Sequence, residues 1–484
     1  MPPSPALVWF RDDLRLSDNP ALTHAARDGR PVAALYVLDE ISPGVRPLGG
    51  AARWWLAQSL KALMRDLNAH GIPLILRRGR AGEIVPALAR ALGAGLVTLN
   101  NRPGAAERAV DVQVAADLRA EGREVHLFNG HLLHELGSVR TAAGTLPRTF
   151  SAFQRAALKD WVPRAPLPVP PRLEAARHAQ QSDDLAQWAL EPSRPDWAQG
   201  LRATWRAGEA AARERLHAFF STGLAGYAEL RDRPDMDHVS RLSPHLRWGE
   251  ISPRQVASAT QHAVEAEGLA PRDGEKFVAE LYWREFNHHI LNTAPDLATR
   301  NLNAAFDAFP WRDAPEDCAA WQSGRTGYPI VDAAMRQLWR TGWMHNRMRM
   351  VVASFLAKHL LVHWRAGERW FWDTLVDADA ASNPGNWQWV AGSGVDAAPY
   401  FRIFNPVLQG EKFDPDGAYV RAFVPELARL PPALIHKPWT GDAAALSRAG
   451  VRLGSTYPHP IVDHAQARAR ALRAFEQVKA QAAG

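Results

Sequence analysis

The sequence predicts two parts of different class: an N-terminal α/β part built on a parallel, Rossmann-like sheet, and an all-α part that follows it. Short β-rich runs alternate with helical patterns over the first 130 residues, whereas strand signals vanish from residue 206 onward. A chain of 484 residues is also too long for one ordinary core. We therefore expect an α/β domain at residues 1–130, an interdomain linker at 131–204 and an all-helical domain at 205–484.

Five apolar runs are the candidate strands, and the stretches between them, such as 51–69 and 105–121, are rich in Ala, Leu and Arg. Strands that alternate with helices form a parallel sheet covered on both faces, and such sheets bind ligands at the carboxyl ends of their strands. Polar loops at residues 11–13, 39–40 and 100–101 occupy those ends. The candidate strands are residues 6–10, 32–38, 72–77, 95–99 and 123–128.

The segments after the sheet carry loop and helix signals. Residues 163–171 (PRAPLPVPP) are proline-dense and can form neither a helix nor a central strand, so we expect an ordered linker that crosses the surface. Farther along, start and stop signals for helices replace the strand patterns, and the second half is predicted to be all-α. These signals are Ser243-Pro244, Ser252-Pro253 with Gly268, and Pro329 with Gly342.

Composition limits the function classes. No run of about 18 apolar residues occurs and the N-terminus lacks a signal-peptide pattern, so we expect a cytoplasmic protein without a membrane span. Cys318 is the only cysteine, which excludes an internal disulfide and a thiolate zinc site. His359 and His363 are spaced i, i+4, but no third ligand accompanies them at a known spacing, so no metal is expected.

Two local concentrations of residues point to binding partners. The net charge is only +6, yet residues 336–369 hold seven Lys or Arg against one acid, Glu368, which favours a phosphate backbone as partner. Of 19 tryptophans, nine fall between Trp311 and Trp389. A core rarely needs so many indoles, because each has an N–H to satisfy, so this density indicates a planar ligand.

Two helical segments could recognise a nucleotide or a base. In residues 239–246, Ser243 can cap a helix, and a positive helix end beside Arg241 would suit a diphosphate, although an ordinary capped helix explains the pattern as well. On the helix expected at 279–290, Glu280 and Trp283 share one face with Arg284. A base needs such a hydrogen-bond partner and stacking plane, whereas a surface ion pair beside a core indole is the alternative.

Two further segments could line a flat ligand. Asn346 and Met350, at i and i+4, would form the floor of a ligand site, polar at one side and apolar at the other. Alternatively, they belong to a helix with a methionine stripe in the core. Residues 377–406 are expected to be a non-helical polar stretch inside the helical domain, where small residues let the backbone approach a cofactor. Within it, Asp377 can neutralise an arginine, and Asn383 can both donate and accept hydrogen bonds.

Together these segments resemble the photolyase and cryptochrome family, and within it the class I cyclobutane-dimer photolyases, over nearly the whole chain. The resemblance implies FAD and damaged DNA as ligands of the helical domain, a second antenna chromophore, and a monomer that repairs cyclobutane pyrimidine dimers with light. The motifs that carry it are VWFRDDLRLSDNPAL (8–22), RLSP (241–244), YWREF (282–286), TGYPIVDAAMRQL (326–338), TGWMHNRMRM (341–350) and WQWVAGSGVDAAPYFRIFNP (387–406).

The resemblance implies roles for individual residues around the flavin. Asp377 would pair with Arg349, Asp379 would contact the flavin edge, and Asn383 would face its N5 atom. Three tryptophans would carry electrons to the flavin, namely Trp387, Trp364 and Trp311. The implied FAD-binding set is Tyr227, Val239, Ser240, Arg241, Leu242, Ser243, Phe277, Trp343, Arg349, Asp377, Asp379 and Asn383.

The resemblance also implies how the lesion and its DNA would be held. Glu280 and Asn346 would bond the pyrimidines, and Met350 would pack beneath the lesion. Trp283 and Trp389 would form walls around it and count among the DNA contacts. The flanking phosphates would be gripped by Arg231, Arg347 and Arg402. Our own hypothesis is that Glu280 stabilises the dimer radical anion by donating or sharing a proton.

Several departures from the family pattern keep alternatives open. Val239 replaces a common threonine, and Phe277 replaces a frequent tryptophan near the flavin. The folate antenna pattern is incomplete, since Glu107 is kept but Ala106 and Leu297-Ala298 depart from it, whereas Arg53 and the loop at Asp39 resemble the deazaflavin-binding branch. The antenna could therefore be a deazaflavin, methenyltetrahydrofolate, another flavin or absent. A cryptochrome photoreceptor, a (6-4) photolyase and a flavin-free nucleic-acid-binding module are the alternative functions.

Overall fold

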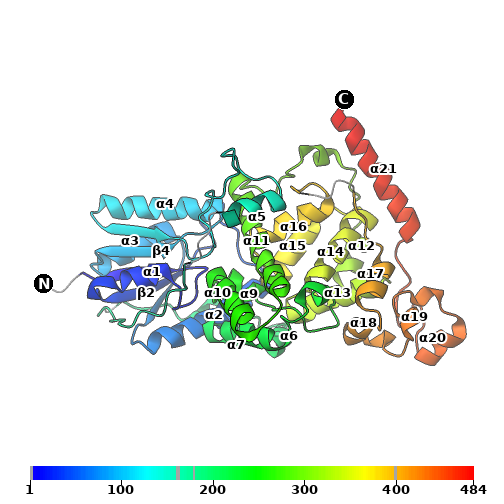
Figure 1. Cartoon of the computed structure of the whole chain (residues 1–484), viewed down its shortest axis with the longest axis horizontal. Coiled ribbons are helices and arrows are strands. Elements are labelled where there is room, and N and C mark those ends of the chain that lie inside the picture. The colour runs from blue at the N-terminus through cyan, green and yellow to red at the C-terminus, as the bar shows by residue number, and fades with distance from the viewer. Residues whose placement is uncertain (1–3, 160–163, 178–179, 397–400, 484) are drawn as a thin grey trace. The chain divides into compact units, whose positions relative to one another are not determined.

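The computed structural model describes all residues except 1–3, 160–163, 178–179, 397–400 and 484 (Figure 1). The chain folds into two compact units, each assembled from separate stretches of sequence. The first unit comprises Met1–Ala225, Ser240–Pro295 and Val376–Ala381. The second unit comprises Gly226–Val239, Asp296–Leu375 and Ser382–Gly484.

The first unit contains a parallel sheet of five strands in the order β3-β2-β1-β4-β5. All five residues of β1 and all seven of β2 are buried, as expected for central strands of a sheet with both faces covered. The predicted strands and the predicted fold class are therefore confirmed. The strands are β1 (Ala6–Phe10), β2 (Val32–Leu38), β3 (Leu74–Arg78), β4 (Leu96–Asn100) and β5 (Glu124–Phe128).

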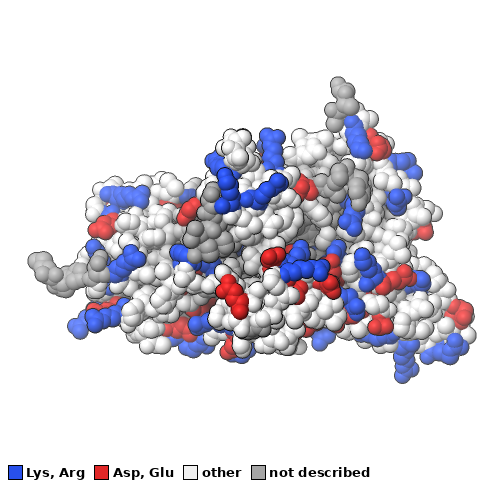
Figure 2. Space-filling view, in the orientation of Figure 1, with Lys and Arg blue, Asp and Glu red and all other residues white. Residues whose placement is uncertain are grey.

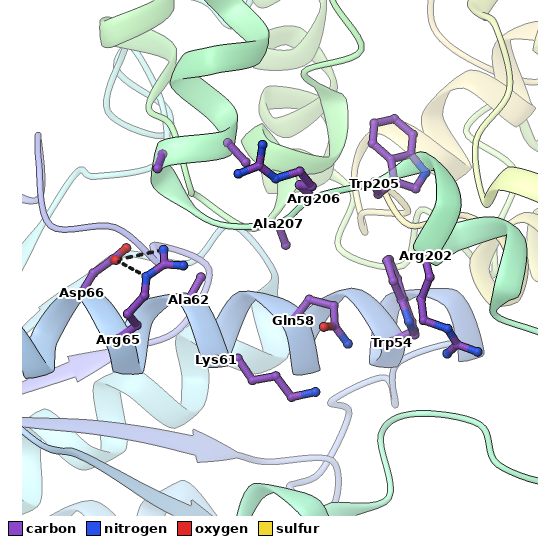
Figure 3. Close-up of a pocket in the computed structure, with 12 residues that line it drawn as sticks. Trp54, Gln58, Lys61, Ala62, Arg65, Asp66, Arg202, Trp205, Arg206 and Ala207 are labelled. Atoms are coloured by element: carbon purple, nitrogen blue, oxygen red, sulfur yellow. Dashed lines mark hydrogen bonds and ion pairs between the residues drawn. The ribbon is translucent and has the colours of Figure 1, made fainter.

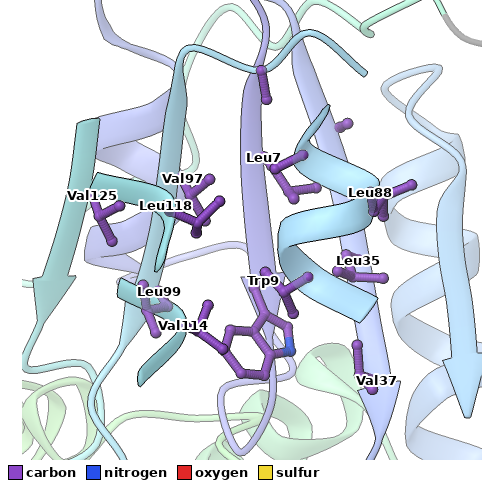
Figure 4. Packing of buried hydrophobic residues seen from close by; sticks show 14 of the residues in the cluster. Leu7, Trp9, Leu35, Val37, Leu88, Val97, Leu99, Val114, Leu118 and Val125 are labelled. Carbon is purple, nitrogen blue, oxygen red and sulfur yellow. The ribbon is translucent and has the colours of Figure 1, made fainter. Parts of the chain in front are cut away.

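Two helices, α3 (Ala81–Ala91) and α4 (Ala105–Ala120), cover one face of this sheet (Figure 4). Successive side chains of a strand point to opposite faces, so Leu7 and Trp9 of β1 lie on this face together. They pack with side chains of β2, β4 and both helices into one apolar cluster. Helix α1 (Pro20–Ala25) packs on β1 and β4, and α2 (Gly50–Asn68) packs on β3.

The other long elements of the first unit are helices, joined by irregular segments. Helix α10 begins after Ser252, whose side chain forms a capping box with Gln255, and ends at Gly268 with φ of 68°. Helix α9 begins at Ser243, so its N-cap is Leu242 and the predicted cap at Ser243 is wrong by one residue. The helices are α5 (Phe150–Lys159), α6 (Gln199–Thr204), α7 (Glu209–Thr222), α9 (Ser243–Arg247), α10 (Pro253–Glu267) and α11 (Pro271–Thr293).

The predicted linker at 131–204 contains helices α5 and α6, while residues 164–171 form neither helix nor strand. Part of this stretch belongs to the sheet region, because Val32 forms a parallel bridge with Ala175 and the Leu76 N–H donates to Ser182 Oγ at 2.9 Å. The predicted domain boundaries stay a prediction.

The second unit is built from helices. Helix α13 begins at Pro329 and ends at Gly342 with φ of 65°, as the sequence predicts. Among the residues that the structure describes, no helix is both long and apolar enough to cross a membrane. The helices are α8 (Tyr227–Leu230), α12 (Pro315–Gln322), α13 (Pro329–Thr341), α14 (Asn346–Ser354), α15 (Trp364–Thr374), α16 (Ser382–Ala391), α17 (Pro406–Phe413), α18 (Ala418–Phe423), α19 (Pro432–Ile435), α20 (Ala443–Ala449) and α21 (His464–Ala483), and a π-helical turn is formed by Phe355–His359.

Helix α16 contradicts the predicted non-helical stretch at 377–406. Pro384 and Gly385 made a helix look improbable, but both lie in the first turn of α16. The first N–H groups of a helix have no intrahelical partner, so a proline there costs no hydrogen bond. The helix therefore forms, with Trp387 and Gln388 buried in its second half.

Candidate functional site

The carboxyl edge of the sheet carries a network of hydrogen-bonded polar side chains. Asn100 donates from Nδ2 to Asp13 Oδ2 at 2.5 Å and to Asn19 Oδ1 at 2.8 Å. Arg11 donates to the Asn100 carbonyl and pairs with Asp111 at 3.5 Å, although burial lowers the pKa of Arg11. These predicted ligand-binding loops therefore hold one another, and they give the first unit a rigid polar edge.

The residues that resemble an antenna site are held in the same way. Asp39 accepts from the Ala81 N–H at 3.0 Å and from the Ser42 hydroxyl at 2.6 Å. Burial acts to raise the pKa of Asp39, but these hydrogen bonds outweigh it, and the pKa is lowered. Arg53 forms an ion pair with Glu40 and donates to the Leu48 carbonyl at 3.1 Å. This arrangement favours neither antenna chromophore over the other.

The predicted diphosphate segment lies just before helix α9 in the first unit. Arg241 has φ of 51°, in the left-handed region that side chains other than glycine rarely adopt. The Ser240 hydroxyl accepts from the Leu242 N–H at 3.4 Å, and the Ser240 carbonyl accepts from Arg215 Nε at 2.9 Å. This turn leads into the N-terminus of α9, and its binding of a diphosphate stays a prediction.

The predicted flavin-edge segment lies at the other end of α9, in the same unit. Arg247 Nε donates to the Ala378 carbonyl at 2.9 Å, and Trp248 Nε1 donates to the Val376 carbonyl at 3.0 Å. The Asp377 side chain is buried and the Asp379 carboxylate accepts from the Ala381 N–H at 2.8 Å. Through α9 the first unit therefore brings together the predicted phosphate segment and the predicted flavin-edge segment.

Arg247 is a residue of this site that the sequence did not single out. Burial acts to lower its pKa, but Asp12, at 2.8 Å, and Asp379 outweigh burial and the pKa is raised. Its two partners, the Ala378 carbonyl and the Asp12 carboxylate, lie far from it in sequence, so no short motif indicates these contacts. Arg247 therefore stays charged and fixes the position of the segment that carries Asp377 and Asp379.

Helix α11 carries the predicted base-reading face in the first unit. The ring of Trp283 stacks on that of Phe150, with centroids 3.6 Å apart and planes within 4°. Glu280 pairs with Lys276 at 3.5 Å, one helical turn earlier. Phe277 is buried against Phe219, with ring centroids 4.8 Å apart. Phe150, which sequence reasoning missed, thus fixes the plane of the predicted stacking residue.

Arg284, the third member of that predicted face, hydrogen-bonds to the chain itself. It donates to the His131 carbonyl at 2.9 Å and contacts His131 Nε2 at 2.6 Å. The Arg284 pKa is lowered, first by burial and in part by Arg247. Because Arg284 anchors residue 131 to α11, it has a structural role.

In the second unit, Asn383 of α16 is oriented by Glu368 of α15. The Asn383 amide Nδ2 donates to the Glu368 carboxylate at 2.9 Å and to the Glu368 carbonyl at 3.0 Å. Both side chains are buried. In the sequence, Glu368 stood out only as the one acid of the basic stretch. In the structure, it fixes which way the Asn383 amide points.

Helix α14 carries the other predicted lesion residues. Asn346, at its first position, is exposed and Met350 is half-buried one turn later. Arg347 forms an ion pair with Asp232 and lies 4.6 Å from the centre of the Phe413 ring. Arg349 donates from Nε to the Met344 carbonyl at 2.8 Å. The predicted phosphate-binding Arg347 therefore has an acidic partner 115 residues away in sequence, which no motif indicates.

Several other predicted residues occupy defined places in the second unit. The Arg231 guanidinium lies 5.3 Å from the centre of the Tyr227 ring, and that of Arg349 lies 6.0 Å from the Trp343 ring. Trp389 donates from Nε1 to the Asp396 carbonyl at 3.0 Å. Val239 also belongs to this unit, whereas the serines that follow it belong to the first.

The three predicted electron-transfer tryptophans all lie in the second unit. Trp364 and Trp387 are buried, whereas Trp311 is half-buried. His363 bridges two of them, since its ring centroid lies 5.7 Å from that of Trp364 and 4.8 Å from that of Trp311. Trp387 packs edge-to-face on Phe371 at 5.0 Å and on Trp321 at 6.1 Å. The unit therefore holds aromatic rings that run from its core towards its surface.

The basic stretch at 336–369 is not a continuous free surface. Arg336 pairs with Glu426 at 2.8 Å, Arg347 pairs with Asp232, and Lys358 is buried. Figure 2 shows that, on the face drawn, lysines and arginines are interspersed with acids. A count of charges along the sequence therefore overstates the positive charge available to DNA.

A cavity of about 680 Å³ lies in the first unit between α2 and residues 202–211 (Figure 3). None of the predicted site residues lines it. Its cations already have acidic partners, for example Arg65 with Asp66 at 3.0 Å and Arg206 with Glu214 at 2.9 Å. We assign it no role in the candidate site.

Comparison with known proteins identifies the families that this chain matches. The family "DNA photolyase" matches residues 6–172, and the family "FAD binding domain of DNA photolyase" matches residues 277–477. Among curated relatives, the deoxyribodipyrimidine photo-lyase of Agrobacterium fabrum is 50% identical over 98% of both chains. Cryptochrome-1 of Arabidopsis thaliana is 36% identical, and the match covers 98% of this chain and 70% of that protein.

Among solved structures, a bacterial class III photolyase from Agrobacterium tumefaciens superposes with a TM-score of 0.95 at 49% identity. The match covers 99% of this chain and 98% of that one. The expected resemblance to the family is confirmed. The finer class I assignment stays a prediction, since this similar structure is described as class III.

Proposed function

This chain belongs to the DNA photolyase and cryptochrome family, and on that premise we propose that it is a deoxyribodipyrimidine photo-lyase, which repairs cyclobutane pyrimidine dimers in DNA with light. The observation that carries the proposal is the match to a protein of that name at 50% identity, over 98% of both chains. A cytoplasmic monomer and a second antenna chromophore remain our expectations.

The chain's residues suit FAD as the resident cofactor. A strained turn leads into the positive end of α9, and α9 also anchors the buried acidic segment at residues 377–379. When bound in its reduced form, FAD supplies the light absorption and the electron that cleaves the dimer. Arg247 holds the acidic segment in place, and Glu368 holds the Asn383 amide in one orientation.

The proposed lesion site uses the side chains that the resemblance implies. Extrusion of a nucleotide from the duplex costs unstacking energy, and a fused dimer stacks poorly, which lowers that cost. Trp283 offers a plane that Phe150 supports from behind. We infer that Glu280 and Asn346 bond the pyrimidines, that Trp389 provides a second wall and that Met350 packs beneath.

The proposed reaction involves no net oxidation or reduction. One electron enters the dimer, the two carbon–carbon bonds that join the pyrimidines break, and the electron returns. Glu280 would share its proton with the dimer while that extra electron is present, which lowers the energy of the negatively charged ring. Lys276, one turn earlier on α11, forms an ion pair with the Glu280 carboxylate at 3.5 Å.

A light-receptor function is the second candidate, and Cryptochrome-1 at 36% identity favours it. The two functions differ in what the reduced, illuminated protein does to dimer-containing DNA. A receptor leaves the dimer intact, whereas a photo-lyase restores two pyrimidines.

The test is repair of an oligonucleotide with one thymine dimer by the reduced holoprotein under blue light, followed through the recovery of pyrimidine absorbance. We expect the wild type to repair it, Glu280→Gln to lower the yield modestly, and Glu280→Ala to lower it more, because glutamine keeps a hydrogen bond that alanine loses. Glu275→Gln, an exposed acid on the same helix, is the matched control and should repair normally.

Failure of the wild type to repair the cyclobutane dimer would refute the proposed function. Repair of a (6-4) photoproduct in place of the cyclobutane dimer would identify the alternative substrate. Unchanged yields in both Glu280 variants would remove only the proposed role of Glu280.

A further inference from the structure

A buried lysine occupies the π-helical turn of the second unit. Lys358 lies in the turn Phe355–His359 and its side chain is only 4% exposed. Its Nζ donates to the Arg402 carbonyl at 2.5 Å and lies 4.3 Å from the centre of the Phe401 ring. Turns of this kind interrupt an α-helix and often occur at functional sites.

The lysine holds one point of an irregular segment, residues 401–405, that is held at several other points. Phe401 is buried and stacks on Phe475, with ring centroids 4.6 Å apart. The Phe404 N–H donates to the Ser354 hydroxyl at 3.3 Å. Asn405 then caps helix α17, accepting from the Val407 N–H at 3.0 Å.

One side chain of this segment points to solvent. Arg402 is exposed, whereas Phe401 and Phe404 on either side are buried. Its guanidinium lies 4.9 Å from the centre of the Phe404 ring. The Arg402 carbonyl is on the inner side, where Lys358 binds it. The segment is thus a clamped loop that presents a single arginine.

Stability alone does not account for a lysine at position 358. Burial, and then the charge of Arg402, lower the pKa of Lys358 to about 7, so the fold disfavours the ammonium form. A methionine has a similar length and would fill this apolar site without that cost. A methionine would, however, offer no hydrogen-bond donor to the Arg402 carbonyl. Residue 402 lies in an irregular segment, so no helical or sheet hydrogen bond pairs that carbonyl.

We propose that Lys358 is a positioning residue for DNA binding, which fixes the backbone at residue 402 so that the Arg402 guanidinium meets a phosphate beside the lesion. The proposal rests on the proposed function and on the phosphate contact that the family resemblance implies for Arg402. Lys358 itself touches no DNA, because it lies in the core. Its contribution to binding therefore passes entirely through Arg402.

A double-mutant cycle tests this statement in the FAD-loaded protein, with a duplex that contains one thymine dimer and a range of salt concentrations. Arg402→Gln should weaken binding by about three- to tenfold and reduce the slope of log affinity against log salt by about one. Lys358→Met should weaken binding by roughly two- to fivefold in the wild-type background. In the Arg402→Gln background, Lys358→Met should have no further effect.

Three readouts separate positioning from a general structural role. Bound flavin, the thermal midpoint, and the repair yield at saturating DNA should be unchanged in Lys358→Met, so only affinity falls. Lys358→Gln keeps an N–H donor on a shorter side chain and should bind between wild type and Lys358→Met. Lys437→Met, which removes an exposed lysine paired with Glu411, controls for the loss of one positive charge.

The outcomes are distinct. Equal losses from Lys358→Met in both backgrounds, or no loss in the wild type, would overturn the positioning role while the proposed function stands. Loss of bound flavin in both Lys358 variants would also overturn it, because the lysine would then be a structural element. Wild-type protein that binds dimer-containing and undamaged duplexes equally would contradict the proposed function, and the positioning role with it.

Discussion

Gly367 lies in helix α15 against the ring of Trp387, and its replacement by alanine should move that ring. An added Cβ would lie 2.1 Å from Cη2 of Trp387, and 2.6 Å from Cζ2 and Cζ3. These distances are far below van der Waals contact, so the indole must shift. Phe371 and Trp321 enclose the indole, with ring centroids at 5.0 Å and 6.1 Å, which makes the shift costly.

The magnitude follows from two opposing terms. In a helix interior, Gly→Ala normally stabilises by about 1 kcal/mol, because alanine loses less backbone entropy. Overpacking of a well-packed core costs about 1–3 kcal/mol. Because the clash involves ring atoms of an enclosed tryptophan, we expect the second term to win and Gly367→Ala to destabilise the protein by about 1 kcal/mol.

Gly82 of helix α3 is the matched control, since an added Cβ there meets nothing within 4 Å. Gly82→Ala should stabilise the protein by about 0.5–1 kcal/mol. Denaturant unfolding of both variants measures the two free energies, and the rate of flavin photoreduction under blue light measures the displacement of Trp387. A Gly367→Ala protein that is as stable as Gly82→Ala, with unchanged photoreduction, would refute the packing argument.

Two further predictions concern a buried carboxyl and the cofactor. Burial raises the pKa of Glu285 to about 7 from 4.5, so the folded protein holds this proton more tightly than the unfolded chain does. The stability of the wild type relative to Glu285→Gln should therefore be greatest below pH 4.5 and should fall by about 3 kcal/mol as the pH rises through 7. Urea unfolding across this pH range measures the difference. A difference that does not change with pH would contradict the raised pKa. Removal of FAD should lower the thermal midpoint, and FAD at a hundredfold excess over its Kd should restore about 2.7 kcal/mol of unfolding free energy. Riboflavin, which lacks the diphosphate, should restore less. Equal effects of the two would argue against the diphosphate turn before α9.

The sheet could be predicted from the sequence because burial on both faces leaves a direct trace. A central parallel strand is apolar at every position, and the run 32–38 coincides with β2. Edge strands were less well bounded, since β3 begins two residues after the predicted start at 72. Their outer residues face solvent and weaken the apolar signal.

The site could be predicted only in part, because helical spacing holds only where the helix continues. His359 and His363 are four residues apart, yet they do not share a helical face. Leu361 between them has φ of 53°, which ends the π turn, and His363 is the N-cap of α15. His359 instead contacts His464, at 2.9 Å between ring nitrogens. A break of this kind depends on the tertiary packing of α21, and the local sequence does not indicate it.

The basic stretch shows why charge counts alone misjudge a nucleic-acid surface. Its seven cations favoured a phosphate backbone as partner, but Arg336 and Arg347 have acidic partners and Lys358 is buried. A cation that already has a carboxylate partner gains less from a phosphate, because the first pair must be broken. The exposed Arg402, outside the stretch, is clamped at its backbone and can meet a phosphate without losing loop entropy. Affinity for DNA should therefore depend more on how firmly a few arginines are held than on how many the sequence contains.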